Sequence, residues 1–168
     1  MAQATLDREL IRKLPKVLLH EHLDGGLRPT TVLELADECG YGELPESDPE
    51  ALGRWFVQGA NRKSLPLYLE GFRHTIALMQ TTDALERVAY EFMEDMARDN
   101  VVYAEVRFAP HFHTAGGLGL DAVMVAVLRG LRRGEADFGS GFGLIVCGMR
   151  NEDPELSTKL VELALSYR

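Results

Sequence analysis

Three segments of the chain are nearly continuous runs of apolar residues. They extend from Val17 to His22, from Val101 to Pro110 and from Gly143 to Arg150. A half-exposed strand alternates apolar and polar residues, whereas a parallel strand covered on both faces is apolar along most of its length. We therefore predict three buried strands of a parallel sheet.

Apolar residues three or four positions apart predict helices between and after these strands. The expected helices cover residues 31–40, 49–57, 66–80, 83–98, 121–133 and 154–167. Thr31 and Glu34 have the spacing of a capping box, and Pro66 suits a first helical turn. Asp153 is the expected N-cap of the last helix, and Gly134 is expected to end the helix before it.

The order strand, several helices, strand, helix, strand, helix predicts an α/β protein. The first two strands are far apart in the sequence, so the helices at 49–57 and 66–80 are expected to be inserted above the sheet. No strand follows the third one, which leaves backbone groups around Leu144 to Cys147 without a partner. Residues 1–168 are therefore expected to form part of a single domain.

Charge and composition narrow the function classes. The chain has 18 Lys and Arg residues against 26 Asp and Glu residues, a net charge of -8, which argues against general binding to nucleic acids or anionic membranes. Met1 to Lys16 lacks the apolar core of a leader, and the longest apolar run, Ala122 to Leu128, is too short to span a membrane. Cys39 and Cys147 lack a C-x-x-C neighbour, so we expect a cytoplasmic protein without disulfides.

The first strand ends in the sequence "HEHLDGG", residues 20–26. If the chain stays extended through Asp24, then His20, His22 and Asp24 project from one face, because side chains two apart in a strand point the same way. Two imidazoles at this spacing can ligate one divalent metal, and the carboxyl end of a strand is where α/β proteins place their sites. The alternative is a pair of surface histidines in a loop.

Two other zinc motifs are excluded. His20 and Glu21 do not begin an H-E-x-x-H motif, because position 24 is Asp rather than His. The chain also lacks an H-x-E followed by P-C-x-x-C, the signature of cytidine-deaminase-type enzymes.

Polar residues at the ends of the other two strands are weaker candidates. Arg107 is either an anion contact or, in the interpretation we favour, the partner of an acid on a neighbouring strand. His111 and His113 form a second H-x-H, but Pro110 interrupts the strand before them, so we expect loop histidines rather than metal ligands. Met149 is expected to pack in the core rather than to line a pocket.

The helix expected at 66–80 carries an apolar stripe with Tyr68 beside it. The stripe consists of Leu65, Leu69, Phe72, Ile76 and Met79. Its position above the strand ends leaves two interpretations open, ordinary core packing or an apolar wall against a planar ligand.

The segments "LPKVLLHEHLDGGLRP" and "YEFMEDMARDNVVYAEVRFAP" resemble the N-terminal half of adenosine deaminase, a family of metal-dependent amidohydrolases, and the likeness covers nearly the whole chain. The resemblance implies a partial TIM-type β/α barrel, made of about the first three strands with extra helices after the first. A complete barrel needs roughly 250 residues. It also implies zinc-dependent hydrolysis of adenosine or 2'-deoxyadenosine to inosine or 2'-deoxyinosine and ammonia, with a small purine nucleoside as the partner.

The resemblance further implies roles for individual residues. His20 and His22 would be zinc ligands, Asp24 would contact the ribose, and His22 would also border the substrate. The helix that covers the purine would correspond to Leu65, Tyr68, Leu69 and Phe72.

The family's general-acid glutamate, its third zinc histidine and a pair of aspartates belong to later segments that residues 1–168 do not contain. No catalytic residue is therefore assigned in this chain, and the isolated chain is expected to have little or no activity. Two alternatives stay open. One is a related amidohydrolase that deaminates adenine or another aminated nucleoside, and the other is a noncatalytic fragment that assembles through its open sheet edge.

Overall fold

The computed structural model describes residues 7–168. Residues 1–6, which belong to the N-terminal segment expected to lack a leader, lie outside the described part of the chain. Its elements are α1 (Arg8–Lys13), β1 (Lys16–His22), the 3-10 turn η1 (Leu23–Gly25), α2 (Pro29–Cys39), α3 (Pro49–Ala60), α4 (Leu65–Leu78), α5 (Thr82–Arg98), β2 (Val101–Phe108), η2 (Pro110–His113), α6 (Leu120–Phe138), β3 (Gly141–Val146) and α7 (Pro154–Ser166). The three strands form one parallel sheet in the order β1-β2-β3. The predicted α/β fold is confirmed.

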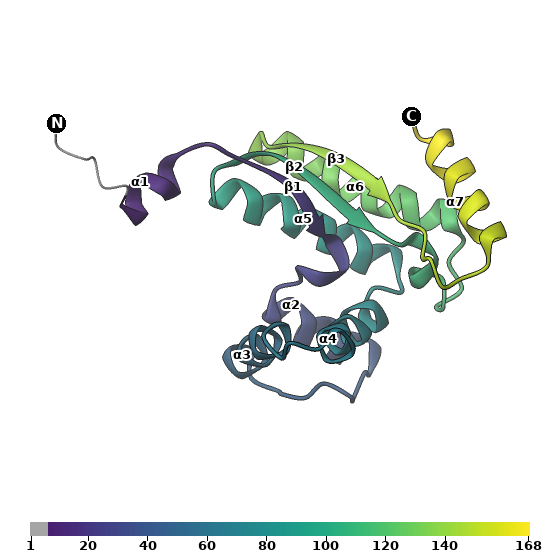
Figure 1. The fold of residues 1–168 in the computed structure, drawn as a ribbon, viewed down its shortest axis with the longest axis horizontal. Coiled ribbons are helices and arrows are strands. Elements are labelled where there is room, and N and C mark those ends of the chain that lie inside the picture. Colours follow the sequence, from purple (N-terminus) through teal and green to yellow (C-terminus); the bar gives the residue numbers. More distant parts are fainter. Residues whose placement is uncertain (1–6) are drawn as a thin grey trace.

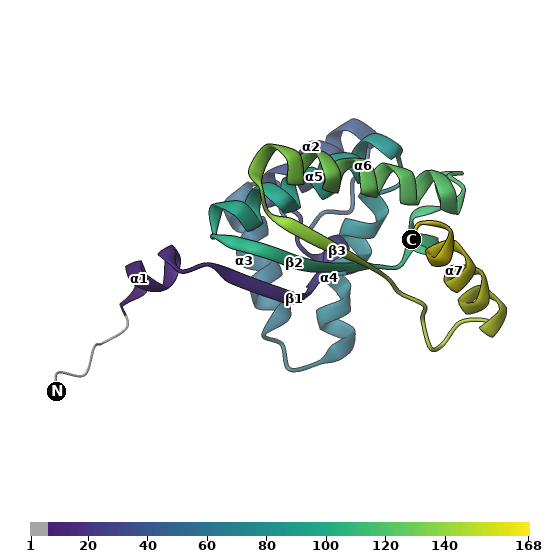
Figure 2. The ribbon, with the colours of Figure 1, turned by 90° about the horizontal axis from the view of Figure 1, so that it is seen from above.

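The helices are arranged in two groups around the sheet. α5 and α6 pack together along one face, and α2, α3 and α4 lie beyond the carboxyl end of β1 (Figures 1 and 2). The core between the sheet and the first group includes Val106 and Phe108 of β2, Met93 of α5 and Leu131 of α6. The predicted insertion of helices after the first strand is confirmed, and it places a helical layer next to the end of β1.

The start of α2 differs from the predicted capping box. The helix begins at Pro29, and the Thr31 hydroxyl donates to Glu91 Oε2 of α5 at 2.6 Å instead of capping its own helix. Arg28 donates to Glu94 and Asp95 at 2.7 and 2.6 Å, and these hydrogen bonds raise the pKa of its guanidinium further above its usual range. The capping prediction is wrong because acids on a distant helix bind these side chains.

Helix α6 continues through Gly134, which the sequence suggested as its end, and stops at Gly139 in the left-handed conformation with φ 76°. The reason is the close crossing of α5 and α6. A Cβ atom on Gly130 would overlap Glu86 O and lie 2.7 Å from Ala89 Cβ, and one on Gly134 would lie 2.8 Å from Met93 Cγ. These glycines serve helix packing rather than helix termination.

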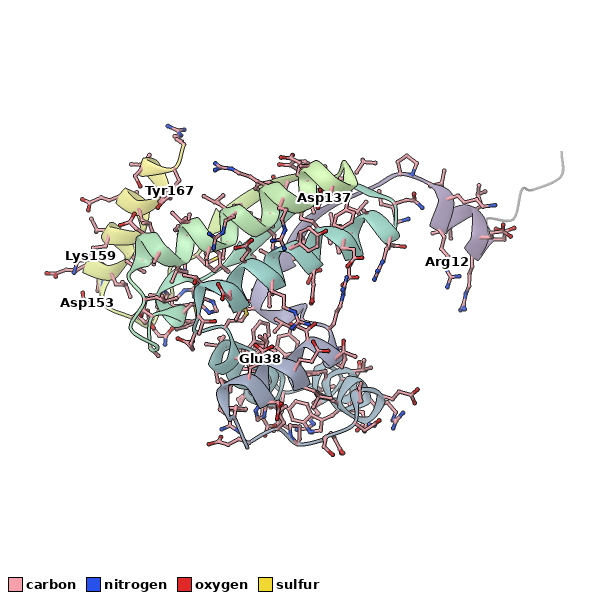
Figure 3. All side chains as sticks on the ribbon, turned by 180° about the vertical axis from the view of Figure 1, so that it is seen from behind. Arg12, Glu38, Asp137, Asp153, Lys159 and Tyr167 are labelled. Atoms are coloured by element: carbon pink, nitrogen blue, oxygen red, sulfur yellow. The ribbon has the colours of Figure 1, made fainter. Side chains whose placement is uncertain are left out.

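The last helix starts as predicted. Asp153 accepts a hydrogen bond from the backbone of Glu155 at 2.9 Å, and the Tyr167 hydroxyl at the other end lies 3.1 Å from Asp121 Oδ1 of α6 (Figure 3). These contacts place α7 beside the start of α6, past the end of β3. Within residues 7–168, no helix is both long and apolar enough to cross a membrane.

Candidate active site

The two histidines of the first strand lie on the same side of the sheet. Their ring centroids are 5.4 Å apart. Leu18 of β1 pairs with Ala104 of β2, and Glu21 pairs with Val106, so the register of the two strands shifts between these pairs. Ala104 and Val106 are both buried. The shift adds one residue to β1, a β-bulge of the kind found near active sites, and brings both imidazoles to the face opposite α5 and α6.

Asp24 does not continue the strand, contrary to the extended conformation that we expected. It lies in the 3-10 turn η1, whose backbone is fixed by a hydrogen bond of 2.5 Å from the Thr75 hydroxyl to Asp24 O. The turn still keeps Asp24 Oδ1 3.7 Å from His22 Nδ1, a distance too long for a hydrogen bond. The Asp24 side chain is therefore near His22 although its backbone is not extended.

Asp24 is 4% exposed, and its Oδ1 has no hydrogen-bond partner in the structure. Burial raises the pKa of Asp24, and the nearby His22 and Arg107 oppose this effect. A buried oxygen without a partner is costly, which favours a ligand hydroxyl as its partner.

Arg107 links the ends of all three strands. Its Nη1 lies 3.2 Å from His20 Nε2, and its Nε donates to Cys147 Sγ at 3.2 Å. Because arginine can only donate, His20 Nε2 accepts and its proton lies on Nδ1. The predicted ion pair with an acid of a neighbouring strand is wrong, since Arg107 is opposite His22 in β1 and Ile145 in β3.

The donor set fits zinc in part. Imidazole is a common zinc ligand, and His20 and His22 supply two, whereas a catalytic zinc site usually has three protein ligands. Within the described part of the chain, no three His, Cys, Asp or Glu side chains are grouped so that they could hold a metal ion.

The predicted apolar helix is α4, and only part of its stripe reaches the histidines. The Phe72 ring meets His22 edge-on, with centroids 5.6 Å apart, and lies 5.6 Å from the Tyr68 ring. Leu65 is 68% exposed and Leu69 is 49% exposed. The structure therefore brings Phe72 to the site, with Tyr68 beside it but 42% exposed, and leaves the two leucines facing solvent.

A cavity of about 270 Å³ lies behind Phe72, between α3 and α4. Its lining consists of Gly25, Trp55, Phe56, Val57, Gly59, Ala60, Tyr68, Gly71, Phe72 and Thr75. A Cβ atom on Gly25 would lie 2.9 Å from Phe72 Cζ, so this glycine permits the ring to pack against the turn. Sequence reasoning missed Trp55 and Phe56, because helical periodicity does not show which other helix an aromatic face meets.

His111 and His113 lie in η2, off the strand as expected, but they are not ordinary loop histidines. His111 Nε2 is 2.8 Å from Glu152 Oε2. His113 is fully buried, and its Nδ1 is 3.0 Å from Met79 O. The His113 contact ties η2 to the end of α4, which is a structural role, whereas His111 Nε2 and Glu152 Oε2 approach each other without forming a hydrogen bond.

Met149 is 37% exposed, so the prediction that it packs in the core is wrong. β3 ends at Val146, earlier than predicted, and the backbone N–H of Cys147 makes a further bond of 2.9 Å to Phe108 O. Met149 follows in the loop before α7 and not in the sheet.

The burial of His113 predicts a pH-dependent stability. Desolvation lowers the pKa of His113 to about 4, although its hydrogen bond to Met79 opposes this shift. Since the unfolded side chain titrates near 6.5, the stabilisation is complete above that pH and is lost between pH 6.5 and 4, by up to roughly 3 kcal/mol. Urea unfolding should show a smaller loss of stability on acidification for His113→Gln than for the unchanged chain. Parallel pH profiles would contradict this expectation.

Comparisons with known proteins agree with the fold and show the family. The family model described as adenosine deaminase matches residues 15–168. Adenosine deaminase 1 of Streptomyces coelicolor is 53% identical over 163 residues, which cover 94% of this chain and 41% of that protein. The chain thus spans less than half the length of this curated relative.

Two solved structures share the arrangement of strands and helices. An amidohydrolase from Burkholderia ambifaria with bound Zn has a TM-score of 0.81 and 28% identity, over 99% of this chain and 45% of its own. The complex of ADAL with IMP has a TM-score of 0.76 and 32% identity, over 95% of this chain and 48% of its own. These similarities confirm the partial TIM-type β/α barrel. Since the family model covers nearly all of the sequence, the chain belongs to the adenosine deaminase family of hydrolases.

Proposed function

We propose that this chain forms the first part of a zinc-dependent hydrolase that converts adenosine or 2'-deoxyadenosine to inosine or 2'-deoxyinosine and ammonia. The observation that carries the proposal is the position of His20, His22 and Phe72. Two imidazoles lie on one face at the carboxyl end of a strand, and an aromatic ring stands edge-on to one of them. The family match and the Zn-bound neighbour support this assignment.

His20 and His22 would hold the zinc ion. When bound, zinc acts as a Lewis acid that lowers the pKa of water and supplies a nucleophile at neutral pH. In the structure, Arg107 Nη1 donates to His20 Nε2 and fixes the imidazole tautomer. If the same nitrogen were to hold a metal, His20 would lose this arginine contact.

Asp24 and the aromatic residues of α4 would bind the nucleoside. Asp24 Oδ1 is a buried acceptor without a partner, so a ribose hydroxyl would satisfy it, and His22 beside it would border the substrate. Phe72 and Tyr68 would cover the purine, because planar aromatic rings present a large apolar surface.

The isolated chain is proposed to turn over little or no substrate. Residues 1–168 contain no segment that matches the family's general-acid glutamate. Loss of a general acid typically costs roughly 100- to 10,000-fold in rate. The test uses a chimera in which this chain is joined to the part of the S. coelicolor adenosine deaminase that follows its matched segment. This chimera restores the later strands. Zinc-dependent inosine formation by the chimera is the expected result.

The role of Asp24 predicts a difference between nucleosides and free bases. In the chimera, Asp24→Ala should lower kcat/KM for adenosine by roughly 10- to 100-fold, because a ribose hydroxyl loses a charged acceptor worth about 1.5–3 kcal/mol. Any activity on adenine should change much less, because adenine has no ribose. Steady-state kinetics on both substrates, with Asp24→Asn as the control that keeps an oxygen acceptor, measures the difference. Equal losses on adenosine and adenine would remove the ribose assignment.

A further inference from the structure

The turn η1 carries Asp24 and is only three residues long. No side chain caps its start at His22. Leu23 is 1% exposed and Asp24 is 4% exposed, so the turn lies inside the protein rather than on its surface. A buried backbone carbonyl requires a hydrogen-bond donor. The direction of the Asp24 side chain therefore depends on the residue that donates to the carbonyl of this turn.

Thr75 of α4 supplies that donor. Its hydroxyl lies 2.5 Å from Asp24 O, and the residue is 3% exposed. A threonine inside a helix commonly donates to a carbonyl three or four residues before it, and here these acceptors are Phe72 O at 3.2 Å and Gly71 O at 3.5 Å. A hydroxyl has a single proton, and Asp24 O is the nearest of the three acceptors. The proton therefore serves the turn rather than the helix.

Phe72, one helical turn before Thr75, also contacts η1. Its ring packs so closely on Gly25 that a Cβ atom there would lie 2.9 Å from Phe72 Cζ, and it stands edge-on to His22. One helix therefore holds the turn by two contacts, a polar one at Asp24 and an apolar one at Gly25. A change in the position of α4 relative to η1 would move the carboxylate as well as the aromatic ring.

The second half of α4 is also attached to segments other than η1. His74 is 2% exposed, and its Nδ1 lies 2.9 Å from the Tyr41 hydroxyl in the loop after α2. Met79 O, just past the end of the helix, lies 3.0 Å from His113 Nδ1 in η2. Thr75 therefore presents its hydroxyl from a supported segment, as a residue that positions a binding group requires.

We propose that Thr75 is a positioning residue for the nucleoside. By holding Asp24 O, its hydroxyl sets the direction of the Asp24 carboxylate, whose buried Oδ1 would accept from a ribose hydroxyl. Thr75 acts through Asp24 and not by contact with the substrate. The inference rests on the proposed function, because the ribose contact of Asp24 belongs to it.

Thr75→Val in the chimera tests this role, because valine keeps the shape of the side chain and removes the hydroxyl. We expect kcat/KM for adenosine to fall by roughly 3- to 10-fold, the loss that corresponds to one neutral hydrogen bond. The affinity for inosine, measured by isothermal titration without zinc, should fall by a similar factor. Thr75→Ser restores the hydroxyl and should return both values to within about 2-fold of the unchanged chimera. If Thr75→Val does not fold, Thr75→Ala removes the same hydroxyl and takes its place.

A double-mutant cycle with Asp24→Ala separates positioning from a general structural role. If Thr75 acts through Asp24, Thr75→Val should change inosine affinity and kcat/KM by less than about 2-fold in the Asp24→Ala background. Thr31→Val is the matched control, since Thr31 is 1% exposed and donates to Glu91 at 2.6 Å, a bond between α2 and α5 that does not involve η1. Urea unfolding of the 168-residue chain should show a comparable loss of stability for the two valine variants, whereas only Thr75→Val should weaken nucleoside binding.

Each outcome decides the proposal. A loss confined to Thr75→Val, repaired by Thr75→Ser and absent in the Asp24→Ala background, is the expected result. An unchanged inosine affinity in Thr75→Val, an equal loss in Thr31→Val, or a loss that persists in the Asp24→Ala background would overturn the positioning role while the deaminase activity of the chimera stands. A chimera that binds inosine without deaminating adenosine would contradict the proposed activity, and the inosine titrations would still decide the role of Thr75. A chimera that does neither would overturn both.

Discussion

Replacing His20 with alanine in the chimera is expected to abolish zinc-dependent deamination and to weaken zinc binding by more than roughly 100-fold. Mutation of a residue that only supports a metal ligand typically costs 10–100-fold in affinity or activity, and loss of a ligand itself should cost more. His22→Ala should have the same effect and should also disturb the edge-on contact with Phe72. Isothermal titration with zinc and a spectrophotometric assay of adenosine measure the two losses separately.

Glu21→Gln is the matched control for these variants. Glu21 Oε1 accepts a hydrogen bond of 3.2 Å from the backbone N–H of His22, and a glutamine oxygen keeps that acceptor. Zinc affinity and kcat/KM should change by no more than about 2- to 3-fold, as for a substitution outside a site. A loss as large as that of His20→Ala would show that the neighbouring carboxylate, and not the pair of imidazoles, determines zinc binding.

The second large effect is expected at the crossing of α5 and α6. Gly130→Ala should destabilise the chain by roughly 2–3 kcal/mol or more, because the added methyl group would overlap Glu86 O and force the helices apart. Helix propensity alone predicts the opposite sign, since alanine is favoured over glycine by about 1 kcal/mol. Urea unfolding of the 168-residue chain measures the change.

Gly59→Ala in α3 separates packing from propensity. Gly59 is also a helical glycine, but a Cβ atom there would meet nothing within 4 Å. This substitution should leave stability unchanged or raise it by up to about 1 kcal/mol. If Gly130→Ala were neutral or stabilising as well, the close helix crossing could not be as described.

The elements most open to prediction from sequence were those fixed by local periodicity. The apolar stripe of α5 and the run that becomes β1 follow directly from which residues must be buried. The errors arose where a distant residue decides the outcome. The local pattern predicts a capping box at Thr31 because it contains no sign of Glu91, the hydrogen-bond partner of Thr31 sixty positions away. Gly134 likewise predicts a helix end, because the local pattern does not show that α5 packs against this glycine.

The candidate site shows the same division. The spacing of His20 and His22 and the strand before them place both imidazoles on one face, and the structure agrees. The β-bulge between Leu18 and Glu21 and the bend at Asp24 depend on pairing with β2 and on the Thr75 hydroxyl, so alternation alone does not predict them. The contact of Arg107 with His20 likewise depends on strand register.

The central proposal is that this chain carries one part of an adenosine deaminase site and depends on later strands for activity. The direct measurement is the rate of inosine formation from adenosine, with and without zinc, for the isolated chain and for the folded chimera. The account predicts zinc-dependent turnover by the chimera and at least roughly 100-fold less by the chain alone, as expected for a missing general acid. Comparable zinc-dependent turnover by the isolated chain, unaffected by His20→Ala, would contradict it.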